Sequence, residues 1–70
     1  MVYMEWMITD MKKPLSESIQ QALDYHKQKY GTPPNILEHS NQLSGVPNVD
    51  GVEFVQIRIP TNILLIGVKP

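Results

Sequence analysis

The sequence predicts an α+β fold, in which one mixed sheet of about four strands packs on one helix within a single domain, residues 1–70. Two observations predict it: an apolar stripe at helical spacing, and three segments with the alternating or continuous apolar pattern of strands, beside a fourth, shorter strand segment. The predicted order is β-α-β-(loop)-β-β: strand 2–9, helix 15–30, strand 35–39, loop 40–51, strand 52–59 and strand 63–69.

The first predicted strand, residues 2–9, has two different faces. Its more apolar face consists of Val2, Met4, Trp6 and Ile8. Its other face consists of Tyr3, Glu5, Met7 and Thr9. Because side chains alternate along a strand, we expect the first set to meet the helix and the second to lie partly in solvent.

The helix, about residues 15–30, carries the signals of both helix ends. Pro14 suits the first turn, and Ser16 or Ser18 can supply a capping oxygen. Gly31 is expected to end the helix in the left-handed conformation, and two prolines follow it. The apolar stripe of this helix consists of Ile19, Ala22, Leu23, His26 and Tyr30.

The second half of the chain is predicted as a short strand, a loop and a hairpin. We expect strand 35–39 to pair in parallel with the first strand through a right-handed crossover. Residues 40–51 are rich in turn formers and predict a flexible loop. Pro60-Thr61-Asn62 suits a three-residue turn, which predicts that residues 52–69 form a hairpin with Ile59 opposite Ile63.

The last strand is apolar on both faces, and one helix is too narrow to cover them. A four-stranded sheet measures about 14 Å between its outer strand axes, whereas a helix is about 10 Å wide. The turn we prefer leaves an apolar set on the face away from the helix. This predicted interface consists of Val52, Phe54, Leu64, Ile66 and Val68, with Tyr3 and Met7 adjoining.

Something is expected to cover this set: the loop 40–51, a second copy of the chain, or another protein. Small domains without cysteines often complete a core by dimerising, and this chain has no cysteine. We therefore expect a non-catalytic protein–protein interaction or accessory module, a homodimer or the binder of a protein partner, rather than an enzyme.

Two alternatives of other classes remain open. A small-molecule binder or simple enzyme would have its site between loop 40–51 and the sheet, with His39 and Asp50 as ligand-binding residues. A weak single-stranded nucleic-acid binder would stack bases on Tyr3 and Phe54, but six Lys and Arg against seven Asp and Glu disfavour it. We expect no nucleic acid as a partner.

No motif predicts a cofactor, a metal site or a catalytic residue, and we expect none of them. His26 lies on the apolar stripe without a carboxylate or histidine four residues away, so we interpret it as a hydrogen-bonded histidine at the edge of the core. No apolar run reaches the roughly 20 residues of a membrane span. We expect no membrane association, and a soluble, cytoplasmic protein.

Overall fold

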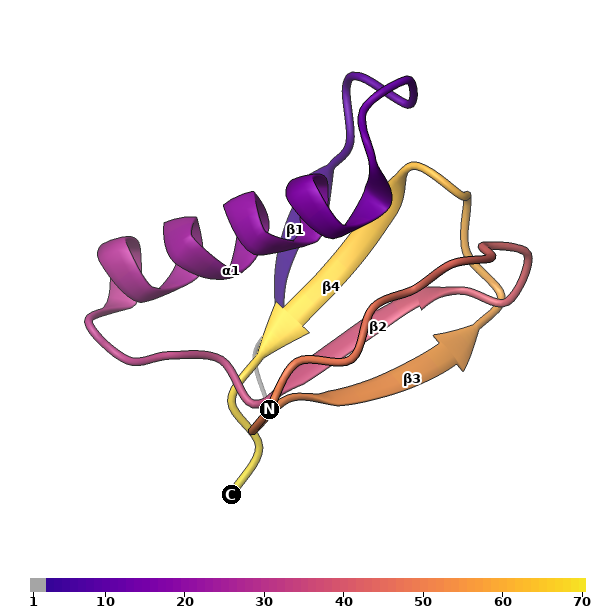
Figure 1. The fold of residues 1–70 in the computed structure, drawn as a ribbon. Coiled ribbons are helices and arrows are strands. Elements are labelled where there is room, and N and C mark those ends of the chain that lie inside the picture. Colours follow the sequence, from indigo (N-terminus) through magenta and orange to yellow (C-terminus); the bar gives the residue numbers. More distant parts are fainter. Residues whose placement is uncertain (1–2) are drawn as a thin grey trace.

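The structure, a computed structural model that describes residues 3–70, has one helix lying on one face of a four-stranded mixed sheet (Figure 1). This confirms the predicted α+β class and the element order. The elements are β1 (Tyr3–Met7), α1 (Leu15–Tyr30), β2 (Ile36–Ser40), β3 (Glu53–Ile57) and β4 (Ile63–Gly67).

Helix α1 has the predicted bounds, and its two ends differ in how they are capped. Gly31 adopts φ 74° and donates its backbone N–H to the carbonyl oxygen of Lys27 at 2.8 Å, as the sequence predicts. The predicted serine cap is wrong, because the helix begins at Leu15 and both serines lie inside it. The backbone oxygen of Pro14 instead accepts hydrogen bonds from the first turn.

The sheet order is β1-β4-β2-β3, and it overturns two predicted pairings. The hairpin of residues 52–69 is wrong, because β2 lies between β3 and β4. The parallel pairing of the first two strands is also wrong, because β4 lies between β1 and β2, as its yellow arrow shows in Figure 1. β4 pairs antiparallel with both neighbours, and β2 pairs in parallel with β3.

The composition of β4 and of the two edge strands agrees with their positions in this order. β4 (sequence ILLIG) is apolar on both faces and takes a central position, where it pairs with a strand along each of its two edges. The edge strands β1 and β3 carry Glu5, Glu53 and Gln56, which are exposed. Charged side chains on edge strands are a common protection against unwanted pairing.

Residues 41–52 connect two adjacent parallel strands and pack on the helix side of the sheet. Val46, Val49 and Val52 are partly buried against the core. The core itself lies between α1 and the sheet. Its buried side chains are Met4, Ile8, Ile19, Ala22, Leu23, Leu37, Leu64 and Ile66.

The strand register decides which face of β4 meets the helix. Met4 pairs with Ile66 and Trp6 with Leu64, so these side chains share one face. Met4 and Trp6 were predicted to face the helix, and they do. Leu64 and Ile66 were assigned to the other face, and that assignment is wrong: both are fully buried, with 0% exposure, beneath the chain's own residues.

Candidate functional site

The face of the sheet opposite α1, which we call the open face, is covered by no helix or strand of residues 3–70 (Figure 1). The strand registers arrange its side chains in three rows across the sheet. These rows are Tyr3–Gly67–Ile36–Glu53, then Glu5–Leu65–Glu38–Val55, and then a third row that contains the pairs Met7–Ile63 and Ser40–Ile57.

Five side chains of the open face form an aliphatic patch: Met7, Val55, Ile57, Ile63 and Leu65. Met7 is 56% exposed, and the other four are half-buried. They lie in two adjacent rows, as one group on β1 and β4 and a second on β3, with Glu38 and Ser40 of β2 between the two groups. Apolar groups gathered in this way favour contact with another apolar surface, because contact removes them from water.

Three glutamates border or enter the aliphatic patch: Glu5, Glu38 and Glu53. None of the four strands contains a lysine or an arginine. Glu53 forms an ion pair with Lys69, which follows β4. The open face therefore combines aliphatic side chains with an excess of negative charge.

The central glutamate, Glu38, is held by a tyrosine from the edge strand. Tyr3 Oη donates a hydrogen bond to Glu38 Oε2 at 2.8 Å. The bond spans β4, because Tyr3 lies opposite Gly67, which has no side chain to obstruct it. This hydrogen bond, followed by desolvation and by the charges of Glu38 and Glu53, raises the pKa of the Tyr3 phenol above its usual 10.0.

The structure does not place the predicted interface residues on one surface. Leu64 and Ile66 belong to the core, and Val52 and Phe54 are partly buried against that core on the helix side. Val68 is 41% exposed beyond the end of β4. The other two predicted residues, Tyr3 and Met7, do lie on the open face.

The sequence analysis missed four residues of the aliphatic patch, although it contained the signal for them. Val55, Ile57, Ile63 and Leu65 alternate with the residues that we assigned to the interface. Both alternating sets of β4 are aliphatic, so alternation cannot tell which set meets the helix. The pairing of β4 with β1 decides it, and this pairing cannot be read from β4 alone.

The predicted ligand site of His39 and Asp50 is not assembled. His39 is 3% exposed on the helix side of β2, where its Nδ1 lies 3.0 Å from the carbonyl oxygen of Ser40. Asp50 is exposed in the turn before β3. His39 pairs with Gln56, whereas Asp50 precedes Glu53, so roughly 10 Å or more of strand separates them.

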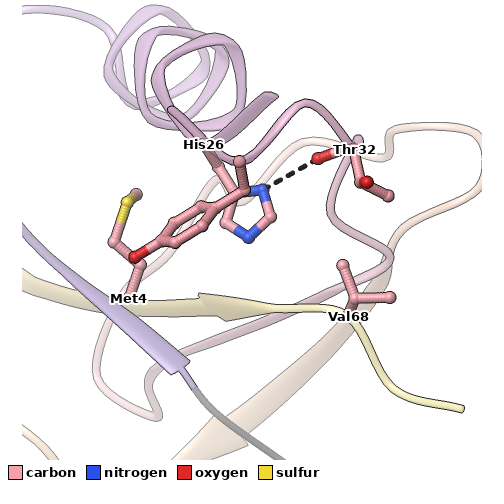
Figure 2. A pocket seen from close by; sticks show the side chains of 5 residues that line it. Met4, His26, Thr32 and Val68 are labelled. Carbon is pink, nitrogen blue, oxygen red and sulfur yellow. Dashed lines mark hydrogen bonds between the residues drawn. The ribbon is translucent and has the colours of Figure 1, made fainter. Parts of the chain in front are cut away.

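A cavity of about 310 Å³ lies between the end of α1 and the sheet (Figure 2). It is lined by Met4, His26, Tyr30, Thr32 and Val68. His26 Nδ1 lies 3.1 Å from the carbonyl oxygen of Thr32, and because a carbonyl only accepts, Nδ1 carries the proton. The ring also packs on Tyr30, with 4.8 Å between centroids. This confirms the predicted position of His26 as a hydrogen-bonded histidine at the edge of the core.

Within residues 3–70, no group of three or more histidine, aspartate or glutamate side chains is placed to hold a metal ion. In the same residues, no helix has both the length and the apolar character needed to cross a membrane.

No protein-family model, curated protein or solved structure matches this chain. Its function is therefore inferred from the surfaces described above. Among residues 3–70, the open face combines exposed apolar and charged side chains.

Proposed function

We propose that the protein is a non-catalytic interaction module whose open face binds another protein. The observation that carries this proposal is the aliphatic patch lying beside Glu5 and Glu38 on a face that α1 and the 41–52 connection leave uncovered. The complementary surface carries aliphatic side chains opposite the aliphatic patch and lysine or arginine near these glutamates. Such a surface removes the patch from water and pairs the carboxylates.

The open face is small compared with the surface that a stable complex buries. Four strands of five residues give a face of about 14 Å by 17 Å, or roughly 240 Å². A stable complex buries about 800 Å² on each partner. The open face alone is smaller than that, so we expect a weak and reversible complex, unless the partner also contacts the edges of the sheet.

A different protein with a positively charged surface suits this face better than a second copy of the chain does, although the sequence led us to expect a homodimer. Two open faces packed on each other bring together two copies of Glu5 and of Glu38 with no lysine or arginine from any strand. Burying carboxylates without a cationic partner is costly. Self-association thus becomes the alternative outcome of the experiment.

The experiment uses a photo-crosslinking amino acid at position 65, on the open face, and at position 21, on the exposed side of α1. A protein crosslinked only from position 65 is identified, purified and titrated against the unmodified chain. We expect Leu65→Ser and Glu5→Lys each to weaken this complex about tenfold, which corresponds to about 1.4 kcal/mol. The control variant Glu17→Lys makes the same charge change on the helix and is expected to bind normally.

Sedimentation of the purified protein decides between a second copy of the chain and a different protein as the binding partner. We expect a monomer at micromolar concentration. A concentration-dependent dimer that Leu65→Ser dissociates would establish self-association instead. A crosslinked protein that binds Leu65→Ser and Glu5→Lys as tightly as the original chain would refute the role of the open face.

A further inference from the structure

Strand β1 is at the edge of the sheet, and one of its sides has no neighbouring strand among residues 3–70. The backbone N–H of Ile8 donates to the carbonyl oxygen of Asn62 at 2.7 Å, so Ile8 belongs to a hydrogen-bonded pair with the chain that enters β4. Hydrogen bonding alternates along an antiparallel strand. The backbone groups of Tyr3, Glu5 and Met7 consequently point to the unpaired side.

A hollow of about 460 Å³ follows this edge. Its lining includes Glu5 and Met7 from the open face as well as Met4 and Trp6 from the helix side, so the hollow lies along the strand itself. The second wall is α1, which contributes Tyr25 and Lys29. It is an unpaired strand edge beside a helix, a geometry in which other domains bind extended peptides.

Two aromatic side chains, Trp6 and Tyr25, line the hollow. The rings of Trp6 and Tyr25 lie with their centroids 5.2 Å apart and tilted by 53°, which joins β1 to α1. Tyr25 is 46% exposed. Large, partly exposed aromatic surfaces are common at the centres of binding sites, because they bury much area with little loss of side-chain freedom.

We propose that an extended segment of a partner protein adds to β1 as a fifth, antiparallel strand. Alternate side chains of that segment enter the hollow against Trp6 and Tyr25, and these are apolar. The others lie beside Glu5 on the open face, and these are basic. This proposal deepens the proposed function, because Glu5 and Met7 belong to both surfaces, but it rests on the strand edge and not on the aliphatic patch.

A second copy of β1 is a poor occupant of this edge. In an antiparallel pair centred on the middle residue of β1, the two copies of Glu5 would lie directly opposite each other. Like charges placed opposite each other across two strands are destabilising, whereas a lysine or an arginine there is stabilising. The charge on the strand therefore selects a basic segment from a different protein.

The test uses a synthetic peptide of alternating lysine and valine, capped at both ends, and two isomers that carry N-methyl groups on either all lysines or all valines. In an antiparallel fifth strand, the residues opposite Tyr3, Glu5 and Met7 are the lysines, and their N–H groups donate to β1. We expect the lysine-methylated isomer to bind at least tenfold more weakly than the valine-methylated isomer. Equal affinities of the two isomers, which have the same charge and composition, would overturn the proposal.

Two readouts locate the peptide. Trp6 is the only tryptophan of the chain, so its fluorescence reports on the hollow directly. Hydrogen exchange is expected to slow at the amides of Glu5 and Met7. Slower exchange at Phe54 and Gln56 of the other edge strand, with no change in β1, would place the peptide on β3 and refute the assignment.

Matched charge variants separate this proposal from the proposed function. Glu5→Lys is expected to lower the affinity for the peptide without N-methyl groups about fivefold. Glu53→Lys, the same change on the opposite edge strand, is expected to leave this affinity unchanged. Equal losses in both would mean that the peptide is held by the negative open face and not by the edge. Leu65→Ser, in the aliphatic patch, is expected to leave peptide binding intact, so that either proposal can fail alone.

Discussion

Alanine substitution of Leu64 and of Leu65 compares two adjacent leucines on opposite faces of β4. Leu64 is 0% exposed and contributes to the core. Leu65 is half-buried on the open face. The two substitutions remove the same atoms from the same strand, so a difference between them measures the difference between the two faces.

The expected losses follow from burial. Leu64→Ala removes three buried carbons, which is worth about 2.4 kcal/mol at about 0.8 kcal/mol each, and the cavity left between α1 and the sheet brings the loss to about 3 kcal/mol. Leu65→Ala leaves a surface depression that water can fill, and no enclosed cavity. We expect it to lower the free energy of unfolding by about 1 kcal/mol. A domain of this length is stable by roughly 3.5 to 10 kcal/mol in total, so the first loss is a large share of it.

The assay is urea unfolding, followed by Trp6 fluorescence and by far-ultraviolet circular dichroism. With a slope of about 1 kcal/mol per molar urea, the midpoint is expected to fall by about 3 M for Leu64→Ala and about 1 M for Leu65→Ala. If Leu64→Ala does not fold, Ile66→Val, on the same buried face, is expected to cost about 1 kcal/mol. A loss for Leu65→Ala equal to or larger than that for Leu64→Ala would show that the two faces of β4 are assigned the wrong way round.

Two further predictions concern hydrogen bonds on the sheet. The pKa of Tyr3 is raised above 10.0, chiefly by its bond to Glu38, so its contribution to stability is present below pH 10 and is lost as the pH rises through the folded-state pKa. Ultraviolet titration of the original chain minus that of Tyr3→Phe isolates this phenol, and a midpoint at or below 10.0 would contradict the prediction. The side chain of Asn35 accepts a hydrogen bond from the backbone N–H of Lys69 at 2.7 Å and donates one to its carbonyl oxygen at 3.0 Å. Asn35→Ala is expected to cost about 1 to 2 kcal/mol and to speed hydrogen exchange at the Lys69 amide, whereas Asn48→Ala, exposed in the 41–52 connection, is expected to change neither. An unchanged exchange rate at Lys69 in the first variant would mean that this pair of bonds does not hold the C-terminal segment.

Local signals in the sequence determined the helix and the class of fold. The bounds of α1 and the left-handed Gly31 depend on residues within a few positions of each other, and these can be read along the chain. The same holds for the two faces of β1, where Glu5 breaks an otherwise apolar pattern. The sequence also showed that β4 has more aliphatic surface than one helix can cover.

Strand order and the identity of the open face were decided by the tertiary structure. The turn signal at residues 60–62 predicted that β3 and β4 pair, but β2 lies between them. The connection of five residues between β3 and β4 is long enough to pass one strand, so the turn residues permit this order as well. β4 offers an aliphatic set to either side, and only its register with β1 places Leu64 beneath α1 and leaves Leu65 on the open face. Pairing between strands far apart in the chain depends on the combined burial of all four, and no single segment contains that information.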